Sequence, residues 1–141
     1  MSSNNIPTAA YELLADIFTG ESAATINKMQ IGSGTTDEAL TDSALATAYT
    51  DHGFEEATVT GSYTSPKLTF THSFTNTGTT TRQVREVGLF ASTGQLMYRY
   101  VFSESELPNF GNVPAGKTIT VTVTLTFRDS AYTQVYSMHL S

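Results

Sequence analysis

The sequence contains no cysteine and no tryptophan, and its 141 residues carry few charges. Without cysteine the chain has no disulfide, no thiolate nucleophile and no cysteine ligand for zinc, so its fold must depend on burial and hydrogen bonds. Charged residues make up 14% of the chain, against roughly 25% in an average soluble domain. Seven of them are basic and 13 are acidic, which gives a formal net charge of -6. Seven scattered cations do not form the basic stripe that binds nucleic acid, which argues against a nucleic-acid-binding protein.

Long hydrophobic runs are also missing. No apolar stretch approaches the roughly 20 residues that cross a bilayer. The opening residues have neither the basic region nor the apolar region of a signal peptide. We therefore expect a protein that acts without a membrane and without a Sec leader. The length fits a single domain over residues 1–141, large enough to bury roughly two-thirds of its unfolded surface.

Hydroxyl groups take the place of charge, because the chain has 25 threonines and 14 serines. In the segment 118–127 five threonines alternate with five apolar residues, which predicts a strand with one buried and one hydroxyl-bearing face. A monomer usually carries Lys or Glu on such a strand to prevent association. The neutral threonine rows therefore predict a surface that is covered by a neighbouring subunit, and we expect a homo-oligomer, with a trimer as one option.

The periodicity at the start of the chain differs from the rest. Tyr11, Leu14 and Phe18 recur at three- and four-residue spacing between Pro7 and Gly20, which predicts one amphipathic helix within an N-terminal segment 1–20. Proline suits the first turn of a helix and glycine its C-terminal end. A helix of about three turns is marginal alone, so we expect its apolar face to pack on another surface. Further along the chain we expect a single helical turn carrying Ala44, Leu45 and Ala48, and one strand over 82–90.

From Phe54 onward the period is two, and short strands are separated by Gly, Pro and Asn turns at roughly ten-residue intervals. This pattern predicts a mainly β fold, an antiparallel β-sandwich of the immunoglobulin-like or jelly-roll-like kind, with one short N-terminal helix. We assign the sandwich core to residues 54–128 and a last strand or an extended arm to residues 129–141. The side chains expected to contact a neighbour are Tyr11, Leu14, Phe18, Tyr132, Val135, Tyr136, Met138 and Leu140.

Candidate catalytic or ligand-binding residues are few. The three histidines lie in three different segments, and their spacing does not predict convergence. The glycines of 32–36 suggest a phosphate loop, but the lysine of a P-loop is missing, so a glycine-enabled bend is favoured. Glu104 and Glu106 would suit calcium, although they lie in an expected loop where solvation is the default. We expect no catalytic, cofactor-binding or metal-binding residues, and no enzyme.

Glu86 is the most informative acidic residue. It lies in phase with Val84 and Phe90, and if that face of the strand is the core, the carboxylate is buried and needs a partner. Arg99, across the expected hairpin, is the candidate partner. In the alternative, Glu86 faces solvent and Val87 faces the core. The sequence leaves both alternatives open.

Several short motifs resemble small structural proteins of tailed bacteriophages, in particular tail-collar and fibre-attachment domains. The similarity covers roughly residues 11 to 128 as a pattern: a glycine-rich bend, a later strand, a hairpin and a turn that starts the threonine strand. The residues that carry it are Ile31-Gly32-Ser33-Gly34-Thr35-Thr36, Thr41-Asp42-Ser43-Ala44-Leu45, Arg85-Glu86-Val87-Gly88-Leu89-Phe90, Gly94-Gln95-Leu96, Val101-Phe102 and Val113-Pro114-Ala115-Gly116-Lys117-Thr118.

The resemblance implies a non-enzymatic virion component that is assembled in the host cytoplasm and binds a major capsid protein or tail and baseplate proteins. The chain is shorter than a fibre with a shaft and tip, so a capsid decoration or cement protein is the favoured role. A small tail, baseplate or fibre-attachment protein is the alternative. A carbohydrate-binding adhesive module is a more distant one, since the chain has seven Tyr and eight Phe but no Trp.

Overall fold

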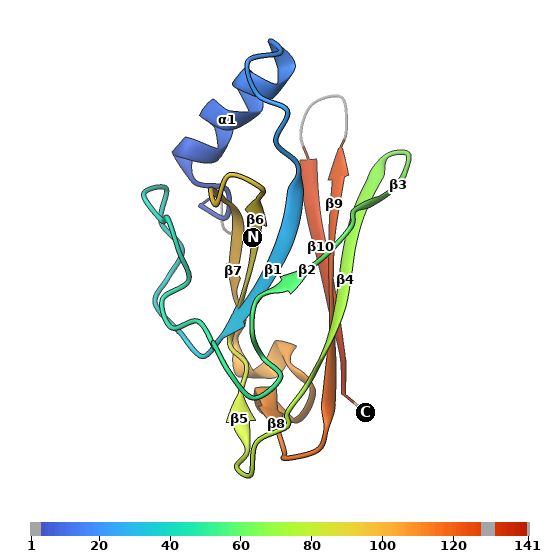
Figure 1. Ribbon diagram of the computed structural model, residues 1–141. Helices are drawn as coiled ribbons and strands as arrows, with labels where there is room; N and C mark the ends of the chain where they lie inside the picture. Colours follow the sequence, from blue (N-terminus) through green and yellow to red (C-terminus); the bar gives the residue numbers. More distant parts are fainter. Residues whose placement is uncertain (1–3, 128–131, 141) are drawn as a thin grey trace.

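Two four-stranded antiparallel sheets pack face to face, with a helix at one end of the stack (Figure 1). The order is β2-β1-β6-β7 in one sheet, called sheet A, and β10-β9-β4-β3 in the other, called sheet B; β5 and β8 form a small third sheet. The elements in chain order are α1 (Thr8–Phe18), β1 (Ile26–Gly32), β2 (Ala57–Thr58), β3 (Ser62–Thr64), β4 (Lys67–Thr75), β5 (Arg82–Gln83), β6 (Glu86–Ala91), β7 (Leu96–Val101), η1 (Glu104–Glu106), η2 (Pro108–Gly111), β8 (Asn112–Val113), β9 (Thr118–Phe127) and β10 (Tyr132–Leu140). The predicted fold class, a mainly β antiparallel sandwich with one short helix, is confirmed.

The computed structural model describes residues 4–127 and 132–140. Within β10 it describes the side chains of Met138 and Leu140. The residues before α1 lie beside β7, where Arg99 donates its amide to the carbonyl of Asn5, and α1 lies across the end of the sandwich at which β1 begins (Figure 1). The η1–η2 segment and the β5–β8 pair lie at the opposite end. Among the described residues, no helix is long and apolar enough to span a membrane.

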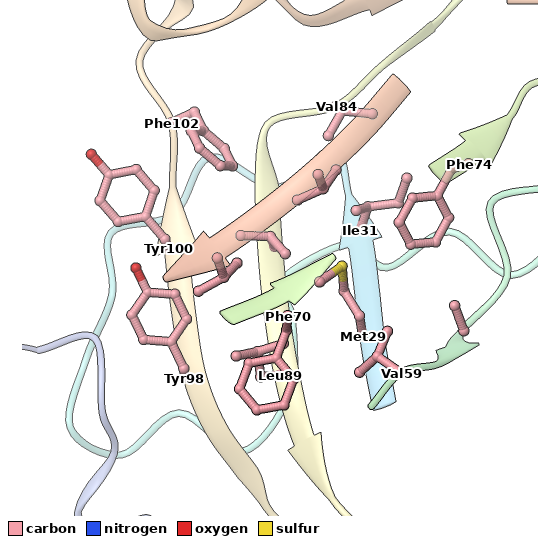
Figure 2. Packing of buried hydrophobic residues seen from close by; sticks show 14 of the residues in the cluster. Met29, Ile31, Val59, Phe70, Phe74, Val84, Leu89, Tyr98, Tyr100 and Phe102 are labelled. Carbon is pink, nitrogen blue, oxygen red and sulfur yellow. The ribbon is translucent and has the colours of Figure 1, made fainter. Parts of the chain in front are cut away.

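The core fills the space between the two sheets. Sheet A contributes Met29, Ile31 and Leu89, and sheet B contributes Phe70 and Phe74, all 0–2% exposed. Figure 2 shows these side chains pointing toward one another, with the rings of β7 along one side. Alternate positions of β4 and β9 are buried while their neighbours are threonine or serine, as the period of two requires. The threonine strand therefore has the two faces that its sequence predicts.

Three boundaries differ from the sequence-based expectation. The sandwich does not begin at residue 54, because β1 lies between β2 and β6 in sheet A. The segment expected as one strand over 82–90 is two strands in different sheets, since Arg85 donates its amide to Gly32 and ends the pairing of β5 with β8. Residues 44–48 form no helical turn; the segment is extended enough for Ala48 to form an isolated bridge with Gly32.

The C-terminal segment is a strand and not a free arm. Nine consecutive residues of β10 pair with β9 without a break in register. Met138 and Leu140 are partly buried and pack against the main core. The C-terminal strand, one of the two alternatives that the sequence left open, is therefore the one observed.

Candidate functional site

Residues 33–48, here called the cover segment, lie over the face of sheet A that points away from sheet B. Leu45 from this segment packs with Phe90 and Leu96 in a small second cluster. A Cβ on Gly88 would come within 2.6 Å of the Leu45 side chain, so β6 needs glycine at the point where the segment crosses. All six residues of β6 are buried, because one face contacts the core and the other contacts the cover segment.

The Glu86 carboxylate binds the cover segment to the sheet. Its Oε2 accepts hydrogen bonds from the amides of Gly34 at 2.9 Å and Thr47 at 2.8 Å. Its Oε1 accepts from the amide of Ala46 at 2.9 Å and from Nε of Arg99 at 3.0 Å. The side chain is 0% exposed. A buried carboxylate is costly unless its oxygens are satisfied, and here each oxygen accepts two hydrogen bonds.

Arg99, on the neighbouring strand β7, is the matching buried cation at 2% exposure. Besides Glu86, its guanidinium donates to Oδ2 of Asp42 at 3.0 Å and to the carbonyl of Thr36 at 2.8 Å. Its backbone carbonyl accepts from Asn5 Nδ2 at 2.9 Å. The arginine therefore joins three segments distant in sequence: the β6–β7 hairpin, the cover segment and the N-terminal residues.

The sequence presented two alternatives for Glu86, and the structure combines parts of both: the carboxylate is buried and paired with Arg99, as the first alternative expects, but it does not lie on the core face. Val87 and Leu89 face the core between the sheets, as the second alternative requires. Glu86 is on the opposite face, yet it is buried there by the cover segment. The alternation within β6 distinguishes its two faces but does not show that the outer face is covered. The cover segment is irregular, so its own sequence has no periodicity that would place it over β6. Thr36 and Asp42 are the residues of the cover segment that bind the Arg99 guanidinium. No sequence pattern around them would have identified them as its partners.

The glycine-rich bend has an architectural role. A Cβ on Gly32 would collide with the backbone of Thr47, and one on Gly34 would collide with the Glu86 carboxylate. The amide of Ser33 donates to the carbonyl of Thr47 at 2.9 Å. The amides that a phosphate loop would offer to an anion are thus used within the fold. Of the two interpretations of this motif, the glycine-enabled bend is the one observed.

A row of paired hydroxyls covers the outer face of sheet B. Thr71 and Thr122 lie directly opposite each other across β4 and β9, with their oxygens 3.1 Å apart. Ser73 and Thr120 are 2.7 Å apart. The pairs Thr69–Thr124 at 3.3 Å and Thr75–Thr118 at 2.7 Å extend the row at its two ends. Because these hydroxyls satisfy one another without charge, the row is uncharged and regular, and the charged Lys67 lies beyond its Thr69–Thr124 end.

A groove of about 640 Å³ opens between α1 and the end of the sandwich. One wall is the helical stripe of Tyr11, Leu14 and Phe18, and the other includes Leu68 and Leu125 from sheet B. Phe18 is 83% exposed and Tyr11 is 46% exposed. Ala10 is buried and Leu13 and Leu14 pack partly buried against the core, so the sandwich covers one part of the apolar face of this helix and leaves Tyr11 and Phe18 exposed.

The expected neighbour-contacting residues are thus divided by the structure. Tyr11, Leu14 and Phe18 converge on the groove. Met138 and Leu140 contact the core of their own chain. The side chains of Tyr132, Val135 and Tyr136 lie outside the described part of the structure. Among the described side chains, the expected contact residues of α1 and those of β10 therefore do not form one surface.

The remaining titratable groups are separate from one another. Glu104 pairs with Arg85 at 3.5 Å, whereas Glu106 accepts a hydrogen bond from the Tyr100 hydroxyl at 2.6 Å, so the two acids do not share one site. His72 is half-buried with its ring edge against Phe74. Within residues 4–127 and 132–140, no group of three metal-ligating side chains is close enough to hold an ion.

Asp51 has a pKa that its neighbours lower. A hydrogen bond from the Arg82 guanidinium holds the pKa of this carboxyl below its usual value, and the charges of Arg82 and His52 act in the same direction. Arg82 also lies over the ring of Tyr49, 4.8 Å from its centroid. The pair connects the 51–53 turn to β5 and does not line the groove, and its role is structural.

No protein-family model, no curated protein and no solved structure matches the chain.

Proposed function

We propose that this chain is a non-enzymatic structural protein of a tailed-phage virion, most specifically a capsid decoration or cement protein that stabilises the particle through subunit contacts. The observation that carries the proposal is the exposed apolar stripe of α1 over an apolar groove. A short helix with its stripe left half-open is stabilised when a partner covers it. Large exposed apolar residues such as Phe18 and Tyr11 are the kind that dominate interface energies.

The resemblance to phage virion proteins supports the same proposal through its motifs. Gly34 of the glycine-rich motif, Glu86 of the strand motif and Arg99 of the hairpin meet at one buried centre. In this chain the motif residues Gly34 and Glu86, with Arg99 between the two hairpin motifs, fasten the cover segment to the sheet.

A small tail, baseplate or fibre-attachment subunit is the second candidate, and the resemblance to tail-collar domains favours it. A carbohydrate-binding module is less well supported. The exposed aromatic rings of Tyr63 and Phe110 lie on β3 and on the η2 segment next to β8, at different ends of the sandwich (Figure 1). They do not form a joint platform for stacking on a sugar.

The proposal is tested by incorporation of α1 variants into particles. Phe18→Asp places a charge on the groove, and we expect the number of copies per purified particle to fall by roughly tenfold or more, as for loss of a central interface anchor. Ala9→Asp adds the same charge to an exposed position of the same helix that does not line the groove. It should leave incorporation unchanged. Equal incorporation of both variants would contradict the proposed contact.

A further inference from the structure

The two main sheets have four edges, and three of them are protected from pairing with another chain. β2 is two residues long and β3 is three residues long, too short to serve as templates. The edge of β7 is covered by its own chain: Arg99 donates its amide to Asn5 at 2.8 Å and Val101 donates its amide to Glu38 at 2.9 Å. Short length and covering are the usual ways in which proteins prevent edge-to-edge association.

The fourth edge, β10, is not short and has no paired strand on its outer side in the described residues, although η2 contacts the strand. It is nine residues long, pairs with β9 in continuous register and is the last strand of sheet B. The continuous register shows no bulge that would turn the edge away from a partner. Its sequence, 132–140, contains no Lys, Arg, Asp, Glu or Pro. A long, regular and uncharged edge presents a row of backbone donors and acceptors to a second strand.

We propose that β10 pairs antiparallel with β10 of a second copy of this chain. An edge of this length needs a partner strand of similar length, and the other three edges of the chain do not provide one. β10 matches itself when two copies are related by a twofold axis, because an antiparallel pair is symmetric. The absence of charge removes the like-charge repulsion that would otherwise oppose pairing of identical strands.

The consequence is a closed dimer with a continuous sheet of eight strands, four from each copy. The pairing uses up both β10 edges, so it does not propagate into a trimer or a fibre. Nine paired residues extend for about 30 Å at 3.3–3.4 Å per residue. The hydroxyl rows of the two copies then lie on the same face of the eight-stranded sheet.

This inference is independent of the proposed role in a particle. A dimer can form in solution whether or not the chain binds a virion, and the α1 groove lies on a different part of the molecule. Failure of dimerisation therefore leaves the particle assay unaffected, and failure of particle binding leaves the dimer assay unaffected.

The first test is sedimentation of the whole chain over a range of concentrations. We expect a species of twice the 15.2 kDa chain mass that dissociates on dilution. The double variant Val135→Lys with Ser137→Lys adds two charges to β10 and should be monomeric. The double variant Ser62→Lys with Thr64→Lys adds the same charge to exposed β3, at the other edge of the same sheet, and should remain dimeric.

Backbone amide exchange of the unmodified chain provides a second test that does not depend on the folding of a variant. In an edge strand, alternate amides bond to the neighbouring strand and the others point outward. We expect the outward set of β10 to exchange quickly in dilute solution and at least tenfold more slowly in concentrated solution. The proposal is overturned by a chain that stays monomeric at millimolar concentration, by a trimer, or by a dimer whose outward β10 amides remain unprotected.

Discussion

At the scale of single residues, the most consequential group is the buried Glu86 carboxylate. It accepts hydrogen bonds from three backbone amides and one guanidinium nitrogen, and these bonds fasten an irregular segment of the chain to the sheet. A lone buried acid of this kind in an uncharacterised protein would suggest catalysis. Here its oxygens are occupied by the fold, and the acid positions the chain itself.

Replacing Glu86 by glutamine should destabilise the protein by about 3–5 kcal/mol, the cost of breaking a buried ion pair. The amide group of Gln would face either Gly34 and Thr47 or Ala46 and Arg99, so two donors lose their acceptor in either orientation. Urea unfolding measures the change. Glu56→Gln is the control, since Glu56 is exposed and accepts from Gln30; a surface change of this kind costs within about 0.5 kcal/mol. Equal stabilities for the two variants would contradict the account of Glu86.

The ion pair between Asp51 and Arg82 predicts that the stability of the protein decreases slightly at acid pH. The pKa of Asp51 is lower in the folded chain than its usual 3.8, so its contribution is fully present above pH 3.8 and is lost as the pH falls through the folded value. Asp51→Asn removes this contribution. Between pH 4 and pH 2, the melting temperature of the original chain should therefore fall more steeply than the melting temperature of the Asp51→Asn variant. Parallel curves would show that the pair adds nothing to stability, as happens for many exposed pairs.

At the scale of elements, the hydroxyl rows of β4 and β9 give the sheet a specific register. Opposed hydroxyls contribute roughly 0.2–1 kcal/mol per pair. In a double-mutant cycle, Ser73→Ala and Thr120→Ala should show a coupling in that range, because the two oxygens are 2.7 Å apart. Ser73→Ala with Thr124→Ala should be additive, since Thr124 is opposite Thr69. Equal coupling in both cycles would mean that the hydroxyl contacts do not specify the register.

The elements also show what the sequence could and could not predict. α1, β4 and β9 were predictable because a period of 3.6 or 2 reports burial on one face directly. The cover segment was not predictable, since its position depends on Glu86, which lies some 40–50 residues further along the chain. The division of the segment 82–90 into β5 and β6 escaped prediction because both parts alternate, and the change of sheet at Arg85 leaves no mark on the alternation.

At the scale of the whole molecule, each terminal segment has a different role. The residues before α1 cover the edge of β7 and bind Arg99, while β10 completes sheet B and leaves its own edge open. The groove at α1 and the edge of β10 are therefore two separate surfaces, one suited to a different protein and one to a second copy of the chain.

Truncation after residue 130 should unfold the chain or remove several kcal/mol of stability. The deletion removes the nine-residue pairing with β9 and the packing of Met138 and Leu140 on the core. Circular dichroism with urea titration follows the loss. A truncated chain that unfolds at the same urea concentration as the full chain would show that β10 is an accessory arm and not part of the sandwich.

The central claim, that the chain is a structural component of a virion, is tested most directly by quantitative mass spectrometry of gradient-purified phage particles produced with this gene. The account predicts that the chain co-purifies with the particles at a fixed number of copies per particle, as a structural subunit does. A chain that is abundant in the lysate but absent from the purified particles would contradict it.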